Sequence, residues 1–140
     1  MILLSDKVIL SMEEISKRIK EVVLPEFDIV VGIATGGSIP ASLLAYKTSK
    51  PLIMIRLNFR DPENNPIYDE PKLLSNISND LAGEKIILVD DVSVSGKTLI
   101  KAKSLLAGST ITTFVLKGKA DIVIFPEINK CVAWPWNTTG

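Results

Sequence analysis

Short, continuously apolar runs constrain the fold of this chain more than any other feature. Residues 28–34, 52–57 and 85–90 read DIVVGIA, LIMIRL and KIILVD, and each is apolar at successive rather than alternate positions. Runs of this kind are typical of parallel strands, which are buried on both faces. Parallel neighbours need crossover connections, and helices usually supply them. The sequence therefore predicts an α/β fold in which helices flank a parallel sheet.

Helical patterns alternate with these runs. The first opens at Ser11 in a capping box, the second covers residues 41–47, and the third covers residues 95–107 and stops at Gly108. The inward face of the third helix is predicted to carry Leu99, Ala102, Leu105 and Leu106. Further strands are predicted at residues 8–10, 110–116 and 121–125.

Length, charge balance and cysteine content limit the functional classes to which the protein can belong. The chain has 140 residues, 46% of them hydrophobic, which fits one globular domain with a buried core. Its 16 basic and 16 acidic residues balance, so we expect no nucleic-acid partner. The N-terminus lacks the pattern of a signal peptide, and no apolar run is long enough to cross a membrane. Cys131 is the single cysteine; we expect it to be buried and the protein to be cytoplasmic.

The chain contains no histidine. This excludes Ser-His-Asp and Cys-His catalysis, as well as zinc sites that use histidine ligands. It also removes the side chain whose ordinary pKa lies nearest neutrality. Any proton transfer must therefore use a carboxylate, a lysine, a cysteine, solvent or the substrate itself.

Residues 86–99, IILVDDVSVSGKTL, carry the strongest chemical signal. Asp90 and Asp91 end an apolar strand, and a turn of small, hydroxyl-bearing residues leads from them into a helix. A helix N-terminus offers free N–H groups and a positive dipole end, so this turn can hold a phosphate. The paired acids can accept hydrogen bonds from sugar hydroxyls or help to hold a hydrated Mg²⁺. The combination predicts a site for a ribose 5-phosphate.

A Walker A loop and a plain strand end compete with this interpretation of residues 86–99. The triplet 96–98, Gly-Lys-Thr, matches the end of a Walker A loop, but the first glycine that such a loop requires falls at Asp91. In a plain strand end, the two acids are simply polar residues after the strand and Ser95 is a helix cap. That accounts for Ser95 but not for two adjacent acids after a fully apolar strand.

The segment resembles the motif by which type I phosphoribosyltransferases bind 5-phosphoribosyl-1-pyrophosphate (PRPP). Residues 30–40, VVGIATGGSIP, resemble the pyrophosphate loop of the same family. The resemblance covers about residues 28–136. It implies one domain over residues 1–140, with a parallel sheet flanked by helices and a small hood formed by the termini. It also implies a flexible loop at residues 58–72 and places the hood or tail at residues 121–140.

The resemblance also implies roles for individual residues. The catalytic residues, which hold the ribose hydroxyls directly or through Mg²⁺, are Asp90 and Asp91. The 5′-phosphate is held by Val94, Ser95, Gly96, Lys97 and Thr98. Pyrophosphate is bound by Thr35, Gly36 and Gly37. The base is bound by Lys117, Val132 and Trp134.

Within the family, the strand ending in Lys117 and the later pair Pro135-Trp136 resemble the xanthine–guanine type. There the lysine contacts an exocyclic oxygen of the purine. The chain departs from this pattern in three places. Val94 stands where an acid that assists proton transfer is usual, Thr35 replaces a basic residue, and Cys131 replaces the usual stacking aromatic.

The resemblance thus implies transfer of the phosphoribosyl group of PRPP to a 6-oxopurine, namely guanine, hypoxanthine or xanthine, with release of pyrophosphate. Mg²⁺ is the expected cofactor, and a homo-oligomer, dimer or tetramer, is expected. Two alternatives remain open. One is an enzyme for another base, orotate or adenine, and the other is a PRPP- or nucleotide-binding regulatory module without turnover.

Acids in the loop (Asp61, Glu63, Asp69 and Glu70) match no metal-binding pattern and are expected to be solvated.

Overall fold

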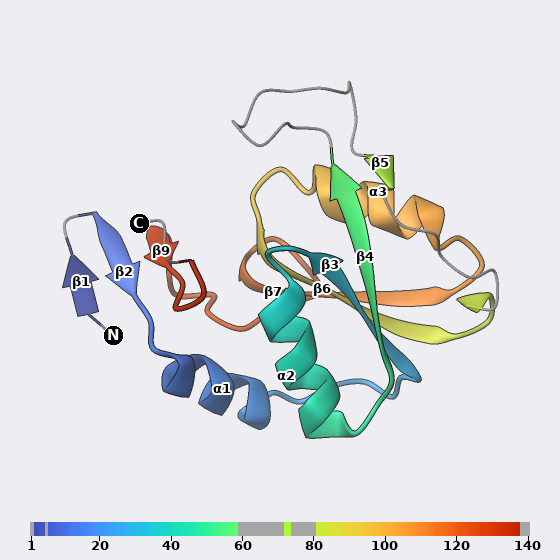
Figure 1. Ribbon diagram of the computed structural model, residues 1–140, viewed down its shortest axis with the longest axis horizontal. Coiled ribbons are helices and arrows are strands. Elements are labelled where there is room, and N and C mark those ends of the chain that lie inside the picture. Colours follow the sequence, from blue (N-terminus) through green and yellow to red (C-terminus); the bar gives the residue numbers. More distant parts are fainter. Residues whose placement is uncertain (1, 5, 59–71, 74–80, 138–140) are drawn as a thin grey trace.

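The computed structural model describes residues 2–4, 6–58, 72–73 and 81–137. Within these residues the larger sheet has the strand order β5-β4-β3-β6-β7-β8. Its strands, in chain order, are β3 (Ile29–Ala34), β4 (Leu52–Asn58), β5 (Lys72–Leu73), β6 (Lys85–Ser93), β7 (Thr110–Gly118) and β8 (Ile122–Val123). All neighbours run parallel except β4 and β5. The predicted α/β fold with a parallel sheet is confirmed (Figure 1).

Helices cover both faces of this sheet. Helices α1 (Met12–Glu21) and α2 (Ser38–Thr48) pack on one face, where they meet alternate strand residues such as Val30 and Val89. Helix α3 (Lys97–Leu105) packs on the other face, against residues such as Val31 and Leu88. Each buried strand therefore contributes to two apolar clusters, which is why its sequence is apolar at consecutive positions.

Local sequence explains where α1 begins and where α3 begins and ends. The Ser11 hydroxyl accepts a hydrogen bond from the Glu14 amide at 3.0 Å, and the Glu14 carboxylate accepts one from the Ser11 amide at 2.8 Å. This confirms the predicted capping box. Helix α3 is shorter than the predicted 95–107, because Gly96 is its N-cap and Leu106 its C-cap. Of the four residues predicted to face inward, Leu99, Ala102 and Leu106 are buried, but Leu105 is 37% exposed.

A second, smaller sheet joins the two ends of the chain. Its strands are β1 (Ile2–Leu4), β2 (Lys7–Ile9) and β9 (Cys131–Ala133), in the order β1-β2-β9. Strand β2 runs antiparallel to β1 and parallel to β9. In Figure 1 this sheet lies beyond the carboxyl ends of β6 and β7. It corresponds to the hood that the sequence resemblance implies.

The predicted flexible loop, 58–72, falls mainly outside the described residues. Its two ends are described, and both belong to strands: Asn58 ends β4, and Lys72 pairs with it at the start of β5. Arg60 and the four loop acids lie in the part that is not described.

Candidate active site

The strand order brings the two predicted anion-binding segments together. From β3 the chain moves to β4 on one side, and it later returns to β6 on the other side of β3. In open α/β sheets, ligands bind at the carboxyl edge where the strand order reverses in this way. The turn at residues 35–37 and the loop at residues 94–98 follow these two central strands, so both lie at that edge. We call them the 35–37 turn and the 94–98 loop.

The 35–37 turn, which follows a cis peptide bond between Ala34 and Thr35, packs directly against the acidic end of β6. A methyl group added at Gly36 would lie 2.6 Å from both carboxylate oxygens of Asp91. One added at Gly37 would lie 2.6 Å from the Val89 carbonyl oxygen and 2.7 Å from that of Ile33. These close approaches explain the two glycines, and they bring the backbone of the turn up to the Asp91 carboxylate.

The two acids differ in their surroundings. Asp90 is 9% exposed, whereas Asp91 is half-buried. Burial, together with the neighbouring Asp91 carboxylate, raises the pKa of Asp90 to about 8. The Asp90 carboxylate accepts a hydrogen bond from the Asp91 amide at 2.9 Å, and Asp91 accepts one from the Val92 amide at 2.7 Å. A group that carries positive charge or donates hydrogen bonds would stabilise both carboxylates in their charged form.

The acids do not end β6, contrary to the sequence prediction. The strand continues to Ser93 because β7 pairs with it as far as Val92↔Lys117 and Ser93↔Gly118. This pairing places Lys117, which is half-buried, on the strand next to the acids. The chain then passes close over β6, and the Lys119 amide donates to the Ser93 carbonyl at 2.9 Å. Ser93 was not among the predicted site residues, although it stands between the acids and the loop.

The 94–98 loop is open to solvent on its outer side. Val94 is 77% exposed, and Ser95 and Lys97 are also exposed. Gly96, the N-cap of α3, has a φ of +82° and makes no side-chain capping bond. The Ser95 hydroxyl accepts from the Lys97 amide at 3.3 Å. The first turn of α3 thus presents backbone N–H groups with space in front of them, as a phosphate site requires.

The hood supplies an aromatic pair. Trp134 is buried and stacks on Trp136 with ring centroids 5.5 Å apart and planes 4° apart. Val132 and Trp136 are partly buried against the same apolar cluster. Cys131 is exposed, so the expectation that it is buried is wrong. The reason is that Cys131 pairs with the exposed Lys7, on the face opposite Val8 and Val132, which pack on the apolar cluster.

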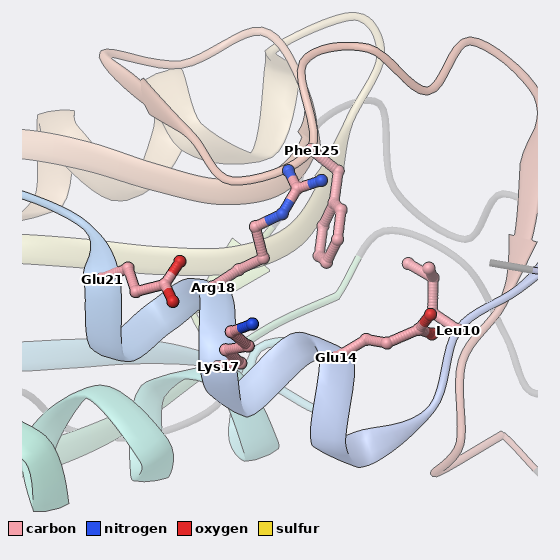
Figure 2. A pocket seen from close by; sticks show the side chains of 6 residues that line it. All are labelled: Leu10, Glu14, Lys17, Arg18, Glu21 and Phe125. Atoms are coloured by element: carbon pink, nitrogen blue, oxygen red, sulfur yellow. The ribbon is translucent and has the colours of Figure 1, made fainter.

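The described residues also form a pocket of about 270 Å³ between α1 and Phe125, and its lining does not include Asp90 or Asp91 (Figure 2). Its lining residues are Leu10, Glu14, Lys17, Arg18, Glu21 and Phe125. The Arg18 guanidinium lies over the Phe125 ring, 4.6 Å from its centroid, and donates to the Ile124 carbonyl at 2.9 Å. It also pairs with Glu127 at 2.5 Å. These contacts attach α1 to the segment after β8. The pocket therefore follows from how α1 packs on the rest of the fold.

A comparison with protein-family models gives one match, to the phosphoribosyl transferase domain, over residues 5–114. The chain belongs to this family. The match includes the 35–37 turn, the acids and the 94–98 loop, which are the segments that carried the sequence resemblance. It ends before Lys117 and before the third strand of the hood.

The relatives differ in the base they name. An orotate phosphoribosyltransferase from Sulfurisphaera tokodaii is 33% identical over 107 residues, which are 74% of this chain and 50% of that protein. The chain thus spans about half the length of this curated relative. A solved purine phosphoribosyltransferase from Pyrococcus horikoshii is 27% identical, with a TM-score of 0.73 and 94% of both chains covered.

A second solved structure shows the fold alone. It is a hypothetical protein from Neisseria gonorrhoeae, solved with bound ppGpp. It is 23% identical, has a TM-score of 0.69, and the match covers 97% of this chain and 92% of that one. In the part of our chain that the structure describes, no helix has the length and apolar character that crossing a membrane requires.

Proposed function

We propose that this chain is a phosphoribosyltransferase that transfers the 5-phosphoribosyl group of PRPP to a 6-oxopurine and releases pyrophosphate. The observation that carries the proposal is the packing of the 35–37 turn against Asp91, at the switch point of the sheet. It joins a backbone turn suited to one anion with a carboxylate pair suited to a sugar. The open 94–98 loop provides the place for the 5′-phosphate.

Each group of residues has a defined task in this reaction. A ring nitrogen of the base forms a bond to C1 of the ribose while the bond from C1 to the pyrophosphate oxygen breaks. The electron pair of the broken bond leaves with pyrophosphate. The chain has no histidine and carries Val94 where an acid is usual, so the proton of the base passes to solvent or to a carboxylate, or the base reacts as its own anion. The amides of Thr35 and Gly36 hold the leaving group, since the Gly37 amide already donates to the Ile33 carbonyl at 2.7 Å. Asp90 and Asp91 hold the ribose hydroxyls.

A Mg²⁺ ion fits this donor set. Asp90 and Asp91 offer hard carboxylate oxygens, and the repulsion between them that helps to raise the Asp90 pKa would be relieved by a cation. Among the described residues there is no cluster of three or more potential metal ligands. Mg²⁺ commonly needs only one or two carboxylates together with substrate oxygens and water. When bound, it would neutralise charge on the departing pyrophosphate.

The base side of the site would be formed by Lys117, Val132 and the stacked Trp134–Trp136 pair. Lys117 supports an oxo base, because an ammonium group can donate to a carbonyl oxygen but cannot accept from an amino group. The purine phosphoribosyltransferase from Pyrococcus horikoshii, which matches along nearly its whole length, supports a purine. We propose a homo-oligomer as the working assembly, in line with the family resemblance.

A second candidate is transfer to orotate. It is favoured by the curated relatives, of which the Sulfurisphaera protein is one, and by Val94, since an acid at that position belongs to the 6-oxopurine pattern. A third candidate is a PRPP-binding module without turnover. The three candidates predict different outcomes in one assay.

That assay measures pyrophosphate release from PRPP and Mg²⁺ with guanine, hypoxanthine, xanthine, orotate or adenine. The proposal expects release with at least one 6-oxopurine. It also expects that replacing both acids (Asp90→Asn with Asp91→Asn) lowers turnover by at least about 100-fold. Asp6→Asn, which changes an exposed acid that is not among the predicted site residues, serves as the control. Full turnover in the double variant would refute the site, and PRPP binding without release on any base would favour the module.

A further inference from the structure

One arginine on α1 holds the chain segment that leads from the larger sheet into the hood. The Arg18 guanidinium donates to the Ile124 carbonyl at 2.9 Å, and both of its terminal nitrogens donate to the Glu127 carboxylate. It also lies over the Phe125 ring, and Figure 2 shows the side chain extending from α1 to that ring. A single planar group thus fixes a main-chain carbonyl, a carboxylate and an aromatic ring of one segment.

The segment that Arg18 holds joins β8 to β9, and we call it the 124–130 connection. It contains neither helix nor strand, so no ladder of paired strands fixes its position. Two of its amides reach the end of β7: Ile124 donates to the Val115 carbonyl at 3.0 Å, and Phe125 donates to the Leu116 carbonyl at 2.8 Å. The place of the connection therefore depends on individual contacts, and those of Arg18 are among them.

The 124–130 connection borders both parts of the proposed base side. At its start, the Phe125 amide bonds to the carbonyl of the residue before Lys117. At its end, the chain enters β9, which carries Val132 and is followed by Trp134. Phe125 and Trp134 are buried in the same apolar cluster. A shift of the connection would therefore move Lys117 and the hood relative to each other.

The proposed phosphate site depends on a different helix. Helix α1, which carries Arg18, packs with α2 on one face of the larger sheet. Helix α3, which follows the 94–98 loop, packs on the opposite face. A change at Arg18 can therefore alter the base side while the 94–98 loop and α3 keep their packing.

We propose that Arg18 is a positioning residue for the base, because it sets the place of the hood relative to Lys117 by holding the 124–130 connection. The inference rests on the proposed function, from which it takes the base side. The side chains of Arg18 and Glu127 are 41% and 45% exposed, and ion pairs this exposed contribute little to global stability. Loss of the guanidinium should therefore affect the geometry of the base side more than the stability of the fold.

The test measures equilibrium binding by calorimetry, which does not require turnover. The ligands are two nucleoside monophosphates, IMP and OMP, and ribose 5-phosphate, which lacks a base. Arg18→Met keeps an unbranched side chain against Phe125 and removes the donors. We expect it to raise the dissociation constant of the tighter-binding nucleotide about 10-fold and that of ribose 5-phosphate less than about twofold. Arg18→Lys, which restores the charge but not the planar fork, should recover part of the loss.

Lys47 offers a matched control. Its ammonium group, also on a half-buried residue, donates to the Ile19 and Val22 carbonyls at 2.8 and 2.9 Å. It therefore ties α1 to α2 rather than to the 124–130 connection. Lys47→Met should lower thermal stability at least as much as Arg18→Met does, but it should leave the ratio of the nucleotide and ribose 5-phosphate dissociation constants unchanged. A purely structural role of Arg18 would lower stability without changing this ratio.

Turnover gives a second readout. With any base that the protein uses, Arg18→Met should raise KM for the base about 10-fold and leave KM for PRPP within about twofold of the parent value.

Two results would overturn the inference: an unchanged ratio of dissociation constants in Arg18→Met, and an equal change of that ratio in Lys47→Met. Failure of the proposed function looks different, since the ratio then changes in Arg18→Met alone but no base releases pyrophosphate. If the parent protein binds neither IMP nor OMP, both the inference and the proposed function are refuted.

Discussion

The 35–37 turn and the 94–98 loop are both short connections from a parallel strand into a helix, yet their glycines serve different physical needs. In the 35–37 turn, the space for a side chain is already filled by Asp91 and by main-chain carbonyls. In the 94–98 loop, Gly96 has open space and is required instead by its φ of +82°. Close packing requires the glycines of the 35–37 turn, whereas the backbone conformation requires Gly96 in the 94–98 loop.

Substitution of Gly37, in the 35–37 turn, should lower the stability of the protein most. In Gly37→Ala, the new methyl group meets the Val89 and Ile33 carbonyl oxygens, and main chain in two paired strands cannot move aside. We expect a loss of about 3 kcal/mol in the free energy of unfolding, measured by denaturant titration. Gly36→Ala should cost less, because it meets only the end of the Asp91 side chain, which can rotate. Unchanged stability of Gly37→Ala would contradict the described packing.

The titration of Asp90, which lies beside the 35–37 turn, makes the free energy of unfolding depend on pH. Its pKa is raised from 3.8 to about 8, so between these values the folded protein binds a proton that the unfolded chain has lost. The stability contributed by the protonated form is therefore lost as pH rises from about 4 to about 8. Asp90→Asn should remove this slope and should be more stable than the parent at pH 8 by about 5 kcal/mol, with little difference at pH 4.

The measurement is denaturant unfolding of both proteins, without ligand, at a series of pH values. Asp6→Asn, which removes an exposed carboxylate, serves as the control and should keep the slope of the parent. Parallel curves for the parent and Asp90→Asn would show that the Asp90 carboxyl titrates normally.

Substitution in the 94–98 loop should change the free energy of unfolding less than substitution in the 35–37 turn. It should change ligand binding more. Gly96→Ala forces an alanine to a φ of +82°, which costs about 1–2 kcal/mol, and nothing but Ile100 lies near the new methyl group. Gly83 is a matched control, since its φ is +84° and its Cβ position is also open, but it lies outside the predicted site. Both alanine variants should lose similar stability, and only Gly96→Ala should also weaken binding of a nucleoside monophosphate. Equal binding in the two variants would remove the 94–98 loop from the phosphate site.

The sequence predicted the sheet, the helices and the juxtaposition of the two connections, because these depend on local patterns and on the rule that parallel strands end at one edge. It misplaced features that depend on pairing between distant segments. The acids were assigned to the end of β6, but β7 extends the strand to Ser93. Cys131 was expected to be buried, and its exposure follows from the register of β9 with β2, which places it on the face away from the apolar cluster.

The Ser93 hydroxyl oxygen and the Trp136 indole nitrogen are buried without a hydrogen-bond partner among the described residues. This could not be predicted from the sequence. Both residues are ordinary in the sequence, and the burial of a single atom depends on how the hood closes against the end of β6. The only signal was the position of Ser93, a polar residue between two acids and a phosphate loop. The base side of the site is thus the part that the sequence constrains least.

The parallel pairing of β2 with β9 has a consequence for how the protein is made. Residues 7–9 leave the ribosome early, but their partner strand, residues 131–133, is synthesised more than a hundred residues later. The larger sheet can assemble from segments that are much closer in the chain, and contacts between distant segments form late. We therefore expect the hood to form last, after the 94–98 loop, which we propose as the phosphate site, is already in place.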